Sequence, residues 1–323
     1  MTKVFVLLAT YNGSKYIDEQ INSLLGQSRI PDKLIISDDH SNDGTWKMLE
    51  KWYREYPDLI EVYQNSSGIK GHVGNFSFLC EIAKKTDGSY FLFCDQDDIW
   101  LENKIEQQLS ACISEENNHE KSTPVLVHSD LKVVDSELND IAPSFFSYQG
   151  LPSAKLHDFP KFLIQNNVTG CTVLINRQLL ELASPLPRQV IVHDWWFALV
   201  AKGYGRLVFL DKPLIAYRQH SNNAIGAKSE KAGLSFAMLK KLWGLKLHIA
   251  NSVEQAEQLL QISENRLFEN EKLVIQFASL SKQSLATRWR LSRSFVNNPH
   301  SLLERIVFVF IFISITNNYR KKR

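Results

Sequence analysis

The first hundred residues alternate between continuous apolar runs and segments whose apolar residues recur every three or four positions. Runs such as Val4–Ala9 lack polar alternation, which is typical of strands buried on both faces of a sheet. In chain order we predict strand Val4–Ala9, helix Ser14–Leu25, strand Leu34–Ile36, a helix through Trp46, Leu49 and Trp52, strand Glu61–Gln64, helix Asn75–Lys85, strand Tyr90–Cys94 and helix Lys104–Glu115. This alternation predicts an α/β fold with a Rossmann-like, mostly parallel sheet flanked by helices.

The pattern changes twice in the rest of the chain. Between Ser122 and Tyr217 it is mixed, and from Leu234 to Phe295 it is mainly helical with few breakers. In the mixed part we predict strands Val125–His128, Lys132–Val134, Thr172–Ile175 and Arg206–Leu210, and helices that begin near Asp158 and at His193. The second change predicts a domain of residues 1–228 followed by a helical C-terminal region of residues 229–323.

Composition indicates a globular protein but does not indicate its function. The 323 residues are 44% hydrophobic and 22% charged, which supports a sizeable core and argues against a disordered chain. The four cysteines are scattered without a C-x-x-C pair, so we expect reduced, partly buried thiols in a cytosolic protein rather than a disulfide or zinc site. The chain opens on an apolar strand, and we expect no secretion leader.

The net charge of +2 conceals a basic C-terminal segment. From Lys272 onward ten basic residues face a single acid, Glu304, a net +9 that leaves −7 for the other 271 residues. The same segment holds the eight apolar residues Ile306–Ile313, far fewer than the roughly 20 that span a bilayer as a helix. We expect an interfacial helix, with Arg320–Arg323 drawn to anionic headgroups, over a buried strand or helix packed on the body. The aromatic run favours lipid over nucleic acid as the polyanionic partner.

Polar motifs follow three of the predicted strands. They are Thr10-Tyr11-Asn12-Gly13, Asp38-Asp39-His40-Ser41 and Asp95-Gln96-Asp97-Asp98. Ligands of parallel sheets bind at the carboxyl ends of strands, so we expect these motifs to converge. Buried carboxylates are costly unless a cation accompanies them, which predicts a divalent metal with a bound diphosphate. A later motif, His193-Asp194-Trp195-Trp196, supplies an aspartate that we interpret as a base facing the same site.

These motifs, with Asn42-Asp43-Gly44-Thr45 and Ile99-Trp100, resemble in order the family 2 glycosyltransferases of GT-A fold over about residues 1–225. A closer resemblance, to bacterial rhamnosyltransferase-like members, comes from 95–100, Thr169-Gly170-Cys171, 193–196 and the 217–223 motif Tyr-Arg-Gln-His-Ser-Asn-Asn. The resemblance implies a metal-dependent, inverting transferase that uses Mg²⁺ or Mn²⁺. It implies a dTDP-rhamnose donor, with UDP-hexoses as the alternative, and a lipid-linked or polysaccharide acceptor in cell-surface glycan synthesis at the cytoplasmic face of the membrane.

The resemblance also implies roles for single residues. It implies a general base at Asp194, metal ligands at Asp95, Asp97, Asp98 and His220, and a nucleotide site formed by Thr10, Tyr11, Asp38, Asp39, Asn75, Asp95 and Arg218. Asn75 also fits a helix-facing structural residue, and His220 a hydrogen-bonded loop histidine. Many family members have Glu-Asp where this chain has His193-Asp194, which leaves the role of His193 open. Arg218 is suited to phosphate because guanidinium binds it in two-point fashion.

Two other function classes compete with this interpretation. A nucleotidyltransferase also places metal-bound aspartates on a parallel sheet, but it usually has a basic, glycine-rich phosphate loop that residues 10–14 lack. A membrane-docked binding protein with a decayed site is disfavoured, because every expected acidic position is filled.

Overall fold

Residues 2–120, 122–151, 158–220, 236–262, 271–295 and 302–315 are described in the computed structural model of the protein. One compact unit holds residues 2–120, 122–151, 168–186 and 192–220, and a second holds 158–167, 187–191, 236–262, 271–295 and 302–315. Several positions singled out above lie outside the described residues: the change near 228, Leu234, residues 221–223 of the 217–223 motif, and Arg320–Arg323.

The first unit is built on strands and short helices. Its strands are β1 (Val4–Thr10), β2 (Lys33–Asp38), β3 (Ile60–Gln64), β4 (Tyr90–Cys94), β5 (Ile99–Trp100), β6 (Val125–Val134), β7 (Asp140–Ala142), β8 (Leu174–Asn176) and β9 (Arg206–Arg218). Its helices are α1 (Ile17–Leu25), α2 (Thr45–Glu55), α3 (His72–Lys84), α4 (Lys104–Asn117), α5 (Phe145–Gln149), α7 (Arg177–Ala183), α8 (His193–Tyr204) and the 3₁₀ turn η2 (Gly170–Thr172).

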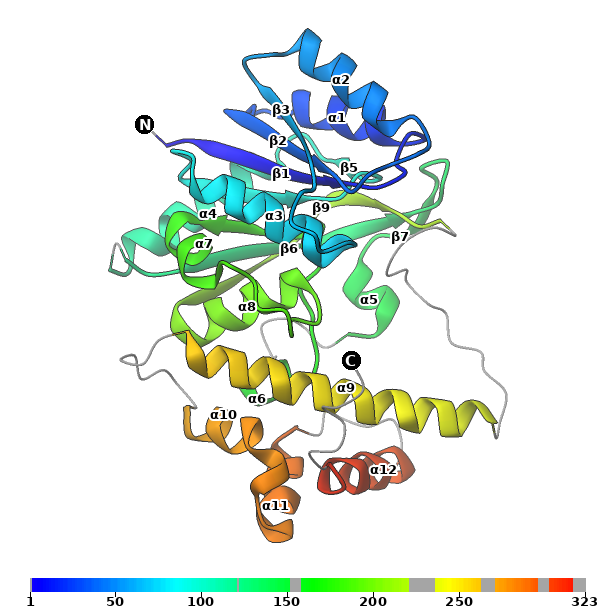
Figure 1. The fold of residues 1–323 in the computed structure, drawn as a ribbon, viewed down its shortest axis with the longest axis vertical. Coiled ribbons are helices and arrows are strands. Elements are labelled where there is room, and N and C mark those ends of the chain that lie inside the picture. Colours follow the sequence, from blue (N-terminus) through cyan, green and yellow to red (C-terminus); the bar gives the residue numbers. More distant parts are fainter. Residues whose placement is uncertain are drawn as a thin grey trace. The chain divides into compact units, whose positions relative to one another are not determined.

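The strands of this unit form a single sheet in the order β3-β2-β1-β4-β8-β6-β9-β5, with β7 beside β6 (Figure 1). The pairs β3–β2, β2–β1 and β1–β4 are parallel, as the strand–helix alternation predicts. Beyond β4 the sheet is mixed: β8 is antiparallel to both neighbours, whereas β6 and β9 are parallel. The α/β class is therefore confirmed, with the parallel part confined mainly to the first four strands.

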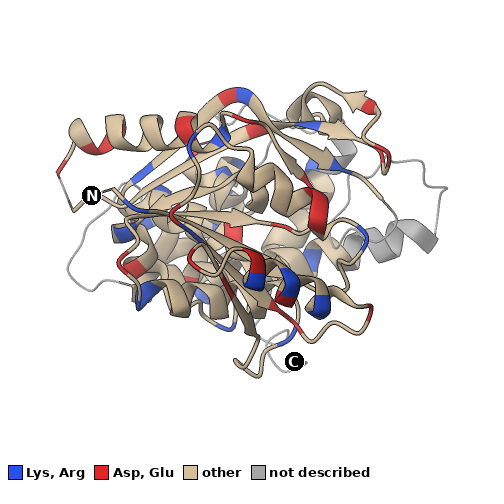
Figure 2. Ribbon diagram, turned by 90° about the horizontal axis from the view of Figure 1, so that it is seen from above, with Lys and Arg blue, Asp and Glu red and all other residues tan. Residues whose placement is uncertain are grey.

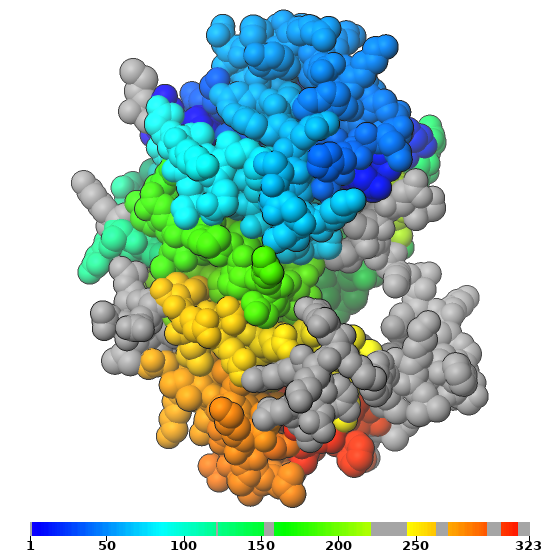
Figure 3. Space-filling model, viewed as in Figure 1, coloured from blue at the N-terminus to red at the C-terminus, as the bar shows by residue number. Residues whose placement is uncertain are grey.

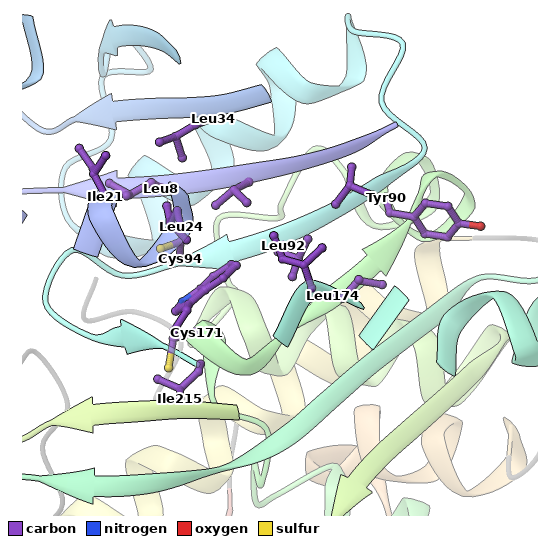
Figure 4. Close-up of a cluster of buried hydrophobic side chains, with 14 of the residues drawn as sticks. Leu8, Ile21, Leu24, Leu34, Tyr90, Leu92, Cys94, Cys171, Leu174 and Ile215 are labelled. Atoms are coloured by element: carbon purple, nitrogen blue, oxygen red, sulfur yellow. The ribbon is translucent and has the colours of Figure 1, made fainter. Parts of the chain in front are cut away.

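Alternate side chains of the sheet fill two different cores. Val6, Leu8 and Leu92 share one buried cluster with residues of α1, α2 and α4, and Figure 4 shows Leu8 beside Ile21 and Leu24 of α1 and Leu92 near Leu174 of β8. On the other face Phe93 packs on aromatic rings of α3 and α8. Because both faces are covered, the strands β1 and β4 are apolar without alternation.

Three strand predictions differ from the structure in extent. The separate strands predicted at 125–128 and 132–134 are one long strand, β6, and the strand predicted at 206–210 continues to Arg218 as β9. Their registers shift near Ser129 and Asp130, and this irregularity masks the continuity in the sequence. The two- and three-residue strands β5 and β7 are too short to produce a periodic signal.

The second unit is helical. It contains α6 (Phe159–Phe162), α9 (Phe236–Gln261), α10 (Glu271–Ala278), the 3₁₀ turn η3 (Leu280–Lys282), α11 (Leu285–Phe295) and α12 (Leu302–Ile313). Stacked rings of Phe277, Phe295 and Phe312 form its centre, with centroids 4.7 Å apart for the first pair and 5.4 Å for the last two. Among the described residues no helix combines the length and apolar character needed to cross a membrane.

A buried polar chain crosses the core of the first unit. The ammonium group of Lys104 lies 3.8 Å from the ring centroid of Trp100 and donates to Gln108 Oε1 at 2.6 Å. The Gln108 amide donates in turn to the backbone carbonyls of Val127 and Thr172. Lys104 and Gln108 are fully buried, so this chain ties β5, β6 and η2 together through α4.

Leu92→Ala should lower the free energy of unfolding by about 2–5 kcal/mol, because it opens a cavity in a fully buried part of the sheet. Urea denaturation followed by circular dichroism measures this loss. Ile30→Ala, at a position that is 50% exposed, is the matched control and should change stability by no more than about 0.5 kcal/mol. Equal losses from both variants would contradict the core described here.

Lys104→Met should flatten the pH dependence of stability between about pH 7 and about pH 8.5. The upper limit is the ordinary pKa of a cysteine thiol, above which the cysteines of the unfolded chain also titrate. Burial lowers the pKa of Lys104 to about 7, so in this window the unfolded chain binds a proton that the folded chain does not, and stability rises with pH. The slope that the variant loses is at most about 1.4 kcal/mol per pH unit. Denaturant titrations at several pH values across this window measure the slope. The exposed Lys51→Met is the control and should keep the wild-type slope. An unchanged slope in Lys104→Met would refute the lowered pKa of Lys104.

Candidate functional site

The predicted motifs meet at one edge of the sheet. Thr10 ends β1, Asp38 ends β2, and Asp95 follows β4, and these three strands are parallel neighbours. In the register Thr10 is opposite Asp38, and its hydroxyl donates to Asp38 Oδ1 at 2.9 Å. The convergence of the first three motifs is therefore a property of the sheet itself.

Asp38 binds its own loop. Besides the Thr10 hydroxyl, its carboxylate accepts the backbone N–H of Ser41 at 2.8 Å and the Ser41 hydroxyl at 2.5 Å. Asp38 is fully buried, and its charge-assisted hydrogen bonds fix the turn that follows β2. Through these contacts the Asp38 carboxylate supports the loop after β2.

Asp39 and Asn75 connect the next layer of loops. Asp39 accepts the Asn65 amide at 2.9 Å and the backbone N–H of Gly71 at 2.6 Å, which places it at the entrance to α3. Asn75, in the first turns of α3, donates to the carbonyls of Thr10 and Ser37 at 3.2 and 2.9 Å. Asn75 Oδ1 is buried and has no hydrogen-bond partner among the described residues.

Gln96 joins the acidic loop to the loop after β1. Its Oε1 accepts the Tyr11 N–H at 2.8 Å and its Nε2 donates to the Tyr11 carbonyl at 3.0 Å. A Cβ on residue 13 would lie 2.3 Å from Gln96 Oε1, so Gly13 leaves the space that this amide occupies. Tyr11 itself is 56% exposed, which leaves its ring available for a ligand.

The acidic loop brings carboxylates into mutual contact. One oxygen each of Asp95 and Asp98 and the Cys171 sulfur lie within 4.8 Å of one another. Burial, together with the charges of Asp97 and Asp194, raises the pKa of Asp95 to about 7. Burial and both neighbouring aspartates raise the pKa of Asp98 as well. Along the ribbon as a whole, acidic and basic residues are interspersed, as Figure 2 shows.

Cys171 is a member of this cluster that sequence reasoning did not place there. Burial and the charges of Asp98 and Asp95 raise the pKa of its thiol well above the ordinary value, so the sulfur is protonated at neutral pH. The Thr169-Gly170-Cys171 motif was recognised in the sequence, but its distance along the chain from Asp98 gave no signal of the contact.

His220 and Asp97 form a pair at the open side of the cluster. His220 Nε2 lies 3.0 Å from Asp97 Oδ2, and the imidazole stacks on Tyr16 with ring centroids 5.0 Å apart. The side chains are 12% and 15% exposed. The histidine predicted as a metal ligand is thus brought next to a predicted acidic ligand.

Arg218 holds the acidic loop from the end of β9. Its backbone N–H donates to Asp98 Oδ1 at 3.1 Å, and its Nε donates to the Asp97 carbonyl at 2.9 Å. The guanidinium also donates to the carbonyl of Ser136, pairs with Glu19 and lies over the Tyr16 ring. A phosphate contact was expected for this residue; the structure shows a 2% exposed side chain engaged by protein groups.

Asp194 lies at the start of α8, across the acidic cluster. Its Oδ1 accepts the N–H of Trp195 at 2.5 Å, in the first turn of the helix. A Cβ on residue 170 would lie 3.4 Å from Asp194 Oδ2, so the glycine of the Thr169-Gly170-Cys171 motif faces the proposed base. Asp194 therefore lies beside Gly170, and the next residue, Cys171, reaches Asp95 and Asp98.

His193 is packed rather than exposed. Its ring stacks on Phe76 with centroids 3.8 Å apart, and neither ring nitrogen has a hydrogen-bond partner among the described residues. Burial, and next the neighbouring His72, lower its pKa, which keeps the imidazole neutral. Trp195 and Trp196 are 2% and 1% exposed and belong to the core, so neither stacks on a sugar at the surface.

The sequence matches a known protein family and is similar to several known proteins. The family described as Glycosyl transferase family 2 matches residues 5–181, more than half of the chain. The chain is 27% identical over 248 residues to the dTDP-rhamnosyl transferase RfbG of Shigella flexneri, covering 74% of this chain and 78% of that protein. It is 27% identical over 244 residues to the putative teichuronic acid biosynthesis glycosyltransferase TuaG of Bacillus subtilis, covering 74% and 85%.

The fold is also similar to that of a solved structure, S. aureus TarS residues 1–349 in complex with UDP-GlcNAc. The TM-score is 0.53 at 18% identity, over 99% of this chain and 92% of that one, which confirms the GT-A-type fold predicted from the sequence. With a sheet edge that gathers the expected motifs and a family match over most of that sheet, the chain belongs to glycosyltransferase family 2.

Proposed function

We propose that this family 2 glycosyltransferase is an inverting, metal-dependent enzyme acting on a nucleotide-sugar donor. One observation carries the proposal: oxygens of Asp95 and Asp98 lie within 4.8 Å of each other and of Cys171 at the carboxyl edge of β4, and Asp194 Oδ2 faces the adjacent Gly170. A cation site and a carboxylate base beside one another are what sugar transfer from a diphosphate requires.

The residues present fit a hard divalent cation. Asp98 Oδ2 is buried without a hydrogen-bond partner among the described residues, and clustered carboxylates that repel one another gain from a shared positive charge. We assign Mg²⁺ or Mn²⁺ to Asp95, Asp97, Asp98 and His220, because carboxylate oxygens suit these ions and the protonated Cys171 thiol does not. When bound, the metal would neutralise the charge that develops on the departing diphosphate.

Asp194 is proposed as the general base. Its carboxylate takes the proton of the acceptor hydroxyl while that oxygen forms a bond to the anomeric carbon. The bond from the anomeric carbon to the diphosphate breaks, and its electron pair leaves with the diphosphate. A single displacement of this kind inverts the configuration at the anomeric carbon, and a positioned base accelerates such a step by roughly 10²–10⁴.

The nucleotide would lie over the loops after β1 and β2. We propose that Asp39 recognises the base, that Tyr11 and Thr10 line its pocket, and that the buried Asn75 closes it. Asp38 supports the turn, since its carboxylate already binds Thr10 and Ser41. Arg218 serves the donor by holding the carbonyl of Asp97, and so acts as a positioning residue for the metal ligands.

For the substrates we propose dTDP-rhamnose as donor and a lipid-linked or polysaccharide acceptor of a bacterial cell-surface glycan. A relative at 27% identity that is described as a dTDP-rhamnosyl transferase supports the donor. The basic, apolar C-terminal segment supports work at an anionic membrane surface, which we place on the cytoplasmic side. We keep residues 1–228 as the catalytic domain and 229–323 as the helical region.

A donor-hydrolysis screen tests the proposal. With Mg²⁺ or Mn²⁺, one of dTDP-rhamnose, UDP-glucose, UDP-galactose and UDP-N-acetylglucosamine should release its nucleoside diphosphate slowly, and EDTA should abolish the release. Asp97→Asn should remove metal-dependent nucleotide binding in calorimetry. Asp194→Asn should keep that binding and lower the rate of turnover by roughly 10²–10⁴.

Asp58→Asn, an exposed aspartate in the loop after α2, is the matched control and should behave as wild type. Full turnover in Asp194→Asn would refute the base assignment while leaving the donor site intact. No release from any donor, combined with no metal-dependent nucleotide binding, would refute the proposed chemistry.

A further inference from the structure

Two helices of the second unit present apolar side chains to solvent in pairs. On α11 Leu285 and Trp289 are 67% and 51% exposed, and on α12 Ile306 and Phe310 are 57% and 72% exposed. Each pair is spaced i, i+4, so its members lie on the same side of their helix. The helices α11 and α12 are drawn in orange and red in Figure 3. Paired large apolar groups in water mark an interaction surface more often than scattered single ones.

These exposed pairs are not the core faces of the helices. The core side of α11 is formed by Leu291 and Phe295, and that of α12 by Ile311 and Phe312, all at most 5% exposed. The sequence predicts an interfacial helix at Ile306–Ile313. The structure instead divides the run, because Ile311 and Phe312 pack inside the unit and Ile306 and Phe310 face outward.

The two helices are fastened to each other. Arg288 of α11 donates to the carbonyls of Ile313 and Ile315 at 2.8 Å each, at the C-terminal end of α12. The Phe295 and Phe312 rings lie 5.4 Å apart beneath them. The Arg288 guanidinium thereby satisfies carbonyl groups at the end of α12 and joins the two helices.

The charge on α11 is positive, and on α12 Glu304 and Arg305 precede the exposed pair. Residues 281–295 contain Lys282, Arg288, Arg290 and Arg293 and no acidic residue. Arg290 and Arg293 are exposed, and the Arg293 guanidinium lies 5.2 Å from the Trp289 ring centroid. Arg305 is exposed next to Ile306. Aromatic rings at headgroup level with arginines extending to lipid phosphates are typical of helices that lie in a membrane interface.

We propose that α11 and α12 form a docking face for an anionic lipid bilayer, into which Trp289, Ile306 and Phe310 insert while Arg290, Arg293 and Arg305 contact lipid phosphates. The inference rests on the proposed function only in that a lipid-linked acceptor explains why such a face exists. A second copy of the chain fits less well, because it would bring the same arginines into like-charge contact. A nucleic acid would leave the apolar side chains unburied.

Vesicle flotation of the full chain tests this face. The protein should float with phosphatidylcholine vesicles that contain phosphatidylglycerol and should float far less with phosphatidylcholine alone. Phe310→Ser should weaken partitioning about tenfold, since a large apolar side chain no longer leaves water. Arg290→Gln and Arg293→Gln should each weaken it about fivefold at low salt, and only on the anionic vesicles. The exposed Ile30→Ser of the first unit is the matched control.

Unchanged circular dichroism and melting temperature in Phe310→Ser would confirm that the exposed substitution leaves the fold intact. The docking face is overturned if wild type does not float, if Ile30→Ser loses as much as Phe310→Ser, or if gel filtration shows a dimer that Phe310→Ser dissolves. Donor hydrolysis in vesicle-free buffer is measured in parallel. Hydrolysis without flotation refutes the docking face alone, and flotation without hydrolysis refutes the proposed chemistry alone.

Discussion

The site depends on one electrostatic constraint: three aspartates in four residues must be held together at the end of a buried strand. Left to themselves, Asp95 and Asp98 resist ionisation, because burial and the charge of Asp97 raise both pKa values. Such a cluster stays in place only if the surrounding chain fixes its backbone. Much of the architecture around β4 serves that purpose, and a cation would complete it.

The fixation comes from three directions that are distant in sequence. Gln96 binds the loop to Tyr11 after β1, and Arg218 binds it from the end of β9 through the carbonyl of Asp97. The third contribution comes from α4, where Lys104 binds Gln108 and Gln108 binds the Thr172 carbonyl. These bonds position the Gly170–Thr172 turn, which places Cys171 at the cluster. The strand β5, between the loop and α4, pairs with β9 and so closes the arrangement.

The parts of this site that were predictable are those with a local signal. Continuous apolar runs identify β1 and β4, and parallel strands bring their carboxyl ends to one edge, so the meeting of Thr10, Asp38 and Asp95 follows from the sequence. The contacts of Arg218 and Cys171 do not, because they join residues that are distant in the chain and depend on the antiparallel strand β8 and the long strand β9. The antiparallel direction of β8 and the register of β9 leave no local signal in the sequence.

Most of these fixing contacts go from a side chain to a backbone atom. Gln96 binds both backbone groups of Tyr11, Asn75 the carbonyls of Thr10 and Ser37, and Gln108 those of Val127 and Thr172. A backbone N–H or C=O group has the same chemistry whichever residue carries it. Each of these hydrogen bonds therefore restricts the identity of only one of its two residues. A network of this kind tolerates replacement of its partners' side chains. Such tolerance is compatible with the 27% identity between this chain and each of two relatives.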